Sequence, residues 1–162
     1  MQGCGYDMMI IIYILSIIIL VRVVYRAFFT ELKTAIDYHQ RAMNYQIYFQ
    51  NKSKSIKILE QALLNPDFNR TDKGSFHLSI GILYYKMKKF DKAKEHFESI
   101  LDFIKKDNFS YMKDLSAVVL TYFELGEKDK ARIIYHWLRA KEKYDPDFGK
   151  LDYLDLYIWK QK

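Results

Sequence analysis

The chain has 162 residues, a formal net charge of +6 and a composition that is 50% hydrophobic. Only two prolines and six glycines interrupt it, so we predict an all-helical protein without a sheet. Lysine and glutamate are interspersed, which is typical of solvated helix faces and argues against a dedicated nucleic-acid groove, and the single cysteine excludes an internal disulfide.

An apolar run begins close to the N-terminus. Met8 to Val21 carry no charge and would span about 21 Å as a helix, short of a hydrocarbon core of about 30 Å. Arg22 and Arg26 lie one turn apart, and their side chains can snorkel to the headgroups, which extends the span. We therefore predict a leader over residues 1–7 and a transmembrane helix with its interface over 8–29. The predicted membrane-interface residues are Arg22, Arg26, Phe28 and Phe29.

Other interpretations of this run fit the residues less well. A cleaved signal peptide needs a basic start, whereas the leader holds Asp7 and no Lys or Arg. A lipoprotein cysteine follows its apolar run, but Cys4 precedes this one. A domain this small can hardly enclose a helix that is apolar on every side. Since basic residues follow the run, at Arg22, Arg26 and Lys33, we predict a single-pass protein with its N-terminus outside and residues 30–162 in the cytoplasm.

The first soluble helix is expected to continue the spanning helix. No glycine or proline lies between Tyr6 and Pro66, so we predict one unbroken helix that ends near Phe49 and couples the anchor rigidly to the domain. Apolar spacing then predicts a second helix that ends at Asn65-Pro66, and a linker over 67–73.

The remaining sequence reads as helical hairpins. Further helices are predicted near 74–87, 91–105, 111–125, 128–143 and 148–160. The helix, turn, helix unit recurs about every 34 to 38 residues, and such a period indicates a solenoid.

The spacing of small and aromatic residues resembles the tetratricopeptide repeat family over about residues 34–143. The second unit matches best, the third moderately and the first weakly. The matching residues are His77, Ile80, Gly81, Tyr84, Ala93, Phe97 and Ile100; then Leu115, Val118, Val119, Tyr122, Ala131, Tyr135 and Leu138; then His39, Ala42, Met43, Gln46, Ser55, Leu59 and Ala62. The resemblance implies an α-solenoid of about three hairpins.

The same pattern suggests how the helices pack. Gly81 and Ala93 are small enough for the two helices of a hairpin to approach closely, while Phe97 and Tyr84 are expected to fill the space between that hairpin and its neighbour. Polar residues at two packing positions, Gln46 and Ser55, predict irregular packing in the first unit. A C-terminal helix is expected to cap the apolar end of the stack with Leu151, Leu154, Ile158 and Trp159.

The family resemblance also implies a binding surface, because the first helices of tetratricopeptide units line a groove that holds a partner's peptide or helix. Carried over by position, the predicted partner-binding residues are Asn44, Tyr48, Leu78, Ile82, Tyr85, Lys86, Leu120 and Phe123. An equally weighted alternative is that the C-terminal helix folds into this groove. Some members of the family bind a chaperone's C-terminal peptide through several Lys, Arg and Asn residues, called the carboxylate clamp. This set is incomplete here, since only Asn44, Lys86 and Lys113 are present.

The residue patterns of catalytic and metal sites are absent from the sequence. The four histidines show no HExxH spacing, and Cys4 lies on the far side of the predicted span from them. The glycines form no phosphate-binding loop. We therefore expect no enzyme activity, catalytic residue, metal or cofactor.

These features together predict a membrane-anchored adaptor or scaffold that recruits a protein partner. One alternative is a small immunity or regulatory protein that inhibits a dedicated partner. Another is a structural subunit that assembles through its transmembrane helix, for which Ser16 is the strongest helix-contact candidate. Lipid contact is expected through one span, nucleic acid is not an expected partner, and the oligomeric state is left open.

Overall fold

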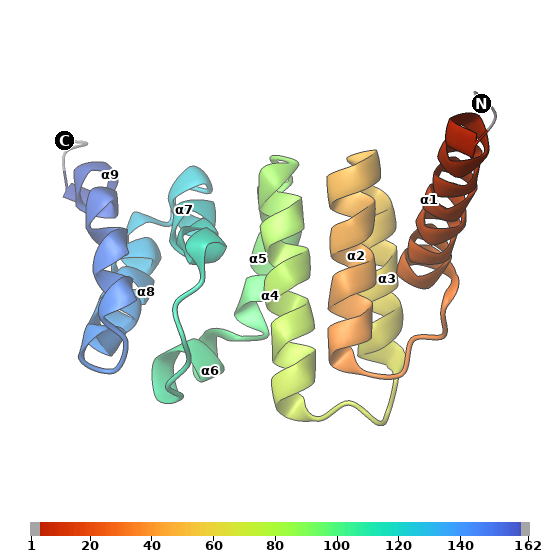
Figure 1. The fold of residues 1–162 in the computed structure, drawn as a ribbon. Coiled ribbons are helices and arrows are strands. Elements are labelled where there is room, and N and C mark those ends of the chain that lie inside the picture. Colours follow the sequence, from red (N-terminus) through yellow and green to blue (C-terminus); the bar gives the residue numbers. More distant parts are fainter. Residues whose placement is uncertain (1–3, 160–162) are drawn as a thin grey trace. The chain divides into compact units, whose positions relative to one another are not determined.

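The computed structural model describes residues 4–159, without the side chains of residues 4–8 and Arg26, and this part of the chain contains helices and no strand (Figure 1). The helices in chain order are α1 (Cys4–Phe29), α2 (Ala35–Phe49), α3 (Lys52–Leu64), α4 (Arg70–Lys86), α5 (Phe90–Glu98), α6 (Leu101–Lys106), η1 (Lys113–Leu115), α7 (Ser116–Glu124), α8 (Lys128–Arg139), η2 (Ala140–Lys143), η3 (Pro146–Leu154) and α9 (Asp155–Trp159). The chain divides into two compact parts, Met1–Ile58 and Leu59–Lys162, with the boundary inside α3.

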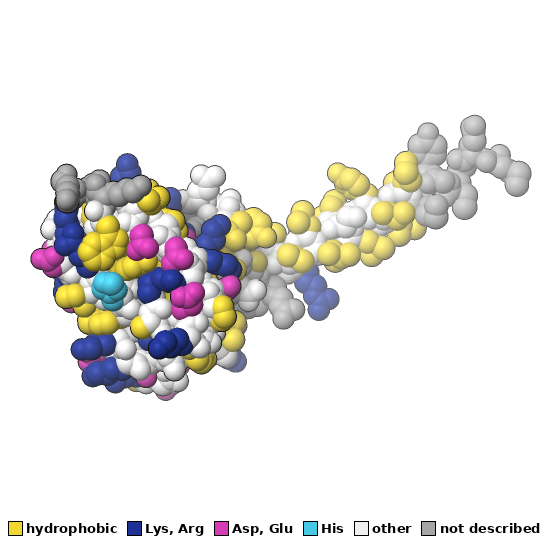
Figure 2. All heavy atoms as spheres, turned by 90° about the vertical axis from the view of Figure 1, so that its left-hand side faces the viewer, with side chains coloured by type: hydrophobic (Ala, Val, Ile, Leu, Met, Phe, Trp, Pro, Cys, Tyr) yellow, Lys and Arg dark blue, Asp and Glu magenta, His cyan; other side chains and the backbone are white. Residues whose placement is uncertain are grey.

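Helix α1 is long and apolar enough to cross a membrane. Its segment Met9–Phe29 has 21 residues and would span about 31 Å, which matches a hydrocarbon core. None of this segment is buried within the protein, and hydrophobic side chains follow one another along its visible face (Figure 2).

The prediction of one continuous helix to Phe49 is wrong, because α1 ends at Phe29 and α2 begins at Ala35. The hydroxyl of Thr34 accepts a hydrogen bond from the Asp37 backbone N–H at 3.2 Å, and the Asp37 carboxylate accepts one from the Thr34 N–H at 2.8 Å. This reciprocal capping box starts a new helix without any glycine or proline. The hydrogen bonds from Thr34 also lower the pKa of Asp37.

Helix α2 holds the C-terminal end of α1. The Arg41 guanidinium donates to the carbonyls of Phe28 at 2.5 Å and Thr30 at 2.7 Å, and the Asn44 amide donates to Ala27 O at 3.2 Å. Carbonyls at a helix C-terminus lack partners within the helix and carry partial negative charge. Arg41 therefore supplies hydrogen bonds to these carbonyls and offsets their partial negative charge.

Replacing Arg41 should loosen this connection between helices. We expect Arg41→Ala to speed amide hydrogen exchange in residues 30–40 by about ten-fold, since a hydrogen bond from a charged donor contributes about 1.5 to 3 kcal/mol. The measurement is hydrogen exchange by mass spectrometry on the full chain in detergent micelles. Arg70→Ala in the other compact part is the control and should leave these residues unchanged. Equal exchange in Arg41→Ala and the wild type would show that the contact does not stabilise the junction.

The contact between α2 and α3 uses a buried serine. Ser55 is fully buried, and its hydroxyl donates to Ala42 O at 2.6 Å, with Asn51 O at 3.1 Å as a second acceptor. The polar Ser55 is therefore accommodated at this packing position, because its hydroxyl is hydrogen-bonded to backbone carbonyls.

Helix α4 begins earlier than predicted. Asn69 and Asp72 form a second capping box, with the Asn69 side chain accepting from Asp72 N at 2.9 Å and the Asp72 carboxylate accepting from Asn69 N at 3.3 Å. The predicted linker over 67–73 therefore contains the first turn of α4.

Helices α4 and α5 pack against each other, with α4 in front of α5 in Figure 1. Gly81 and Ala93 are both buried at this contact, as their small size predicted. A Cβ atom at Gly81 would overlap Phe97 Cε1 and lie 2.7 Å from Phe97 Cδ1, so the phenyl ring rests directly on the α4 backbone. The predicted helix near 91–105 is interrupted, since α5 ends at Glu98 and α6 begins at Leu101.

Helices α7 and α8 form the next antiparallel pair, joined by a turn in which Gly126 has φ +78. Helix α7 starts later than predicted. The Tyr111 N–H donates to the Asp145 carboxylate at 2.8 Å, and residues 107–112 form a non-helical segment that is followed by η1.

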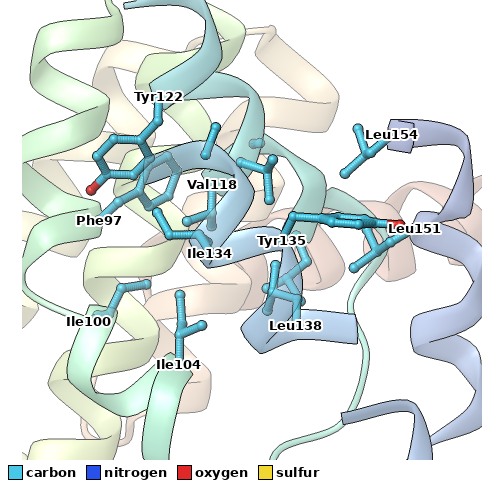
Figure 3. Packing of buried hydrophobic residues seen from close by; sticks show 14 of the residues in the cluster. Phe97, Ile100, Ile104, Val118, Tyr122, Ile134, Tyr135, Leu138, Leu151 and Leu154 are labelled. Atoms are coloured by element: carbon cyan, nitrogen blue, oxygen red, sulfur yellow. The ribbon is translucent and has the colours of Figure 1, made fainter. Parts of the chain in front are cut away.

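One hydrophobic core joins the helices from α4 to α9. Phe97 and Tyr122 lie together above Ile134, while Leu151 and Leu154 approach from the C-terminal segment (Figure 3). Leu151, Leu154 and Ile158 are buried as predicted, but Trp159 is 52% exposed. Its ring lies over the Arg132 guanidinium at 5.2 Å instead of covering the core.

Candidate protein-binding surface

The first helices of the two hairpins in the part Leu59–Lys162 carry a partly apolar surface. We call Ile82, Tyr85, Lys86, Leu120 and Phe123 the α4–α7 face. Its four apolar members are half-buried and rest on the core cluster, while Lys86 is exposed. The core therefore positions these side chains and leaves part of each accessible.

An ion pair joins the C-terminal end of α4 to the segment before α7 at this surface. The Lys86 ammonium lies 2.7 Å from the Asp114 carboxylate, which precedes α7. Both side chains are substantially exposed, so the pair contributes little to stability and mainly orients Lys86. The Lys128 ammonium lies 5.7 Å from the centre of the Phe123 ring, at the far end of α7.

Aromatic residues of the C-terminal segment border the α4–α7 face. Burial raises the pKa of Tyr85, and the nearby Glu124, Tyr153 and Tyr157 raise it further. Tyr153 and Tyr157 are 46% and 50% exposed, and Leu156 is 55% exposed. Sequence reasoning treated this segment as a cap and missed these residues, although the four-residue spacing of Tyr153 and Tyr157 indicates a shared helix side.

Three predicted partner-binding residues lie elsewhere. Leu78 is only 8% exposed and belongs to the core, so it supports the surface without presenting a contact. Asn44 and Tyr48 belong to the part Met1–Ile58 and line a pocket of about 390 Å³ between α1 and α2. The continuous helix predicted for residues 8–49 could not reveal that α1 packs on this side of α2.

The predicted membrane-interface residues lie at the end of α1. Arg22 and Phe29 are exposed, and the side chain of Arg26 lies outside the described residues. Phe28 is half-buried, with ring centroids 5.2 Å from Tyr45 and 5.2 Å from Phe49.

Two histidines meet between α4 and α5. His77 Nδ1 and His96 Nδ1 lie 3.0 Å apart, so one ring donates and the other accepts. Burial, with the neighbouring His77, lowers the pKa of His96 to about 4, and burial lowers that of His77. Among the side chains that the structure describes, no group of three or more His, Cys, Asp or Glu gathers as a metal site.

A second pocket, of about 380 Å³, opens at the first turns of α4 in the part Leu59–Lys162. It is lined by Phe68, Arg70, Lys73, Gly74, His77, Ser99, Ile100 and Phe103. Sequence reasoning placed Arg70 and Lys73 in a linker, and the Asn69-x-x-Asp72 capping pattern is the signal that would have placed them on a helix.

Comparison of the chain with known protein families, with curated proteins and with solved structures finds no match.

Proposed function

We propose that this protein is a membrane-anchored adaptor that holds a partner protein on the α4–α7 face. The observation that carries the proposal is the row of accessible aromatic and aliphatic side chains on α4 and α7, continued by exposed Tyr153 and Tyr157. Large, rigid side chains beside a few charges are the groups that contribute most to protein recognition. The mechanism is binding rather than turnover.

The pairing of helices supports a tetratricopeptide-like arrangement. Helix α4 packs on α5 and α7 packs on α8, and the residues that carry the family resemblance occupy these contacts. In such an arrangement the first helix of each pair faces the partner, which is where Tyr85 and Phe123 lie. The proposed binding surface therefore depends on the tetratricopeptide-like arrangement of these helix pairs.

Helix α1 supplies the anchor in this proposal, with the N-terminus outside and residues 30–162 in the cytoplasm. Ser16 gives little support to assembly through the span, because its hydroxyl donates within α1 to Ile12 O at 2.7 Å. It therefore needs no partner helix to satisfy its hydrogen bond.

Capture of a partner by the full chain in nanodiscs tests the surface. We expect Tyr85→Ser and Phe123→Ser each to weaken binding of a captured protein about 30-fold, as expected for an aromatic anchor. Ile133→Ser is the matched control because Ile133 is 48% exposed on α8, away from the α4–α7 face. Circular dichroism checks that each variant is folded.

The outcomes separate the alternatives. Equal loss in Ile133→Ser and Phe123→Ser would reject recognition by the α4–α7 face. A partner that is retained by both but lost on deletion of residues 8–29 would favour assembly through the span. A captured enzyme or toxin whose activity falls on binding would favour the regulatory or immunity function.

A further inference from the structure

The C-terminal half of α2 runs beside the last turns of the apolar segment of α1. The Asn44 amide bonds to Ala27 O, and further along α2 Tyr48 lines the same pocket as Val23, one turn deeper in α1. The two helices therefore lie antiparallel, and residues 45–49 stand level with about residues 21–28. In a membrane-inserted α1, the exposed Arg22 keeps these turns near the boundary between hydrocarbon and headgroups, because a guanidinium is costly deeper in the bilayer.

The side chains at this level are apolar and largely exposed. We call Tyr25, Phe29, Ile47, Tyr48 and Phe49 the interfacial patch, and each member is at least 61% exposed. Such a cluster is unfavourable in water, whereas tyrosine and phenylalanine are well placed at a membrane interface.

Aromatic packing holds the patch in one arrangement. The Phe28 ring makes edge contacts with Tyr45, Tyr48 and Phe49 at centroid distances of 5.2, 6.2 and 5.2 Å. Tyr25 stacks on Phe29 at 5.8 Å. The end of α2 is thus fixed against α1, and it must accompany α1 into the interface.

The residues that follow the patch are basic. Residues 38–59 contain Arg41, Lys52, Lys54 and Lys57 but no aspartate or glutamate. Lys54 lies 5.9 Å from the centre of the Tyr45 ring. None of the three lysines forms an ion pair with a side chain that the structure describes. Positive charge beside an aromatic patch matches the phosphates of anionic lipids.

We propose that the end of α2 and the start of α3 form a second membrane contact, in which the interfacial patch enters the bilayer interface and Lys52, Lys54 and Lys57 bind anionic phospholipid headgroups. The occupant is lipid rather than protein because the patch is continuous with the apolar surface of α1. This inference rests on the insertion of α1 and goes beyond partner binding, which uses a different surface.

Quenching of tryptophan fluorescence by brominated lipids tests the depth of the patch. The full chain, with Trp137→Phe and Trp159→Phe, is reconstituted in vesicles of phosphatidylcholine brominated near the headgroup end of the acyl chains. Tyr48→Trp should be quenched to the same extent as Tyr25→Trp, which reports the level of α1 itself. Ile36→Trp is the matched control, since Ile36 is 74% exposed at the other end of α2, and it should not be quenched.

A tryptophan within the span distinguishes the two ways in which this experiment can fail. Ile14→Trp should be quenched by lipid brominated deep in the acyl chain if α1 inserts. Quenching at position 14 with none at position 48 would overturn the second contact while leaving the anchor in place. Absence of quenching at both positions would overturn the contact and the anchor together, but binding by the α4–α7 face would be unaffected.

Amide hydrogen exchange tests whether the lysines bind anionic lipid headgroups. Adding phosphatidylglycerol to phosphatidylcholine vesicles should slow exchange of residues 45–58 about a hundred-fold, because three lysines near an anionic surface each contribute roughly a five-fold factor. Changing Lys52, Lys54 and Lys57 together to glutamine should abolish this slowing. The same change at three exposed lysines in the α4–α5 turn and the first turn of α5, Lys88, Lys89 and Lys92, should retain it. Identical wild-type exchange in both lipids would overturn the headgroup assignment.

Discussion

Gly81→Ala is expected to destabilise the part Leu59–Lys162 by about 2 kcal/mol, although alanine is the better helix former. The added Cβ would overlap Phe97 Cε1 and lie 2.7 and 2.9 Å from two further atoms of the Phe97 ring. Phe97 is fully buried beside Tyr122 and Ile134, so its ring has no space into which to move (Figure 3). The clash therefore outweighs the gain of up to about 1 kcal/mol in helix propensity.

The same substitution in the same helix provides the control. At Gly74 a Cβ would meet only Ile100 Cγ2, at an ordinary distance of 4.0 Å. Gly74→Ala should therefore stabilise the protein by about 0.5 to 1 kcal/mol. Urea unfolding of the full chain in micelles, followed by tryptophan fluorescence, measures both changes.

A second substitution tests the cause. Phe97→Leu removes the ring atoms that the new methyl group would meet, so adding Gly81→Ala to Phe97→Leu should cost clearly less than adding it to the wild type. If Gly81→Ala is neutral, or is as costly in the Phe97→Leu background as in the wild type, the close approach of Phe97 to α4 is not what constrains Gly81.

Acid is expected to weaken the contact between α4 and α5. His77 and His96 share one proton across 3.0 Å, and protonating both would bring two positive charges together in a partly buried site. The folded-state pKa of His96 is lowered to about 4, from an unfolded value near 6.5. Between these values the unfolded chain binds more protons than the folded chain. Stability should therefore fall as the pH drops from about 6.5 to about 4, and remain nearly constant above 6.5.

The expected loss over this interval is about 2 kcal/mol, because one pKa unit corresponds to about 1.4 kcal/mol and partial exposure of the rings reduces the full effect. Thermal unfolding between pH 7 and pH 4 measures it. His96→Phe keeps an aromatic ring beside Tyr84 and should flatten the pH dependence. His136→Gln, at an exposed residue outside this contact, should preserve the dependence. A dependence that survives in His96→Phe would assign it to other groups.

The sequence predicted the helical class and the close approach of α4 and α5 because these depend on local properties: few breakers, apolar periodicity and small residues at Gly81 and Ala93. It did not predict that the Phe97 ring rests on Gly81, since Phe97 was expected to fill the space between hairpins. It failed at helix starts. Thr34 and Asn69 begin helices through side-chain hydrogen bonds to residues three positions later, and the search for breakers did not consider them.

The candidate surface was harder to predict, because exposure depends on which helices pack together. Leu78 has the spacing of its neighbours but is covered by the core, and Asn44 and Tyr48 face α1. Tyr153 and Tyr157 are brought near Tyr85 only by the folding of the C-terminal segment, which no local pattern specifies. Periodicity identifies the side of a helix but not the neighbour that covers it.

The hydrogen bonds from Arg41 and Asn44 to the end of α1 have a mechanical consequence. A spanning helix responds to a thicker or thinner bilayer chiefly by changing its tilt. Because Arg41 and Asn44 of α2 are hydrogen-bonded to the last carbonyls of α1, the two helices would tilt together about residues 27–30. Bilayer thickness would thereby set the angle at which α2 meets the membrane plane.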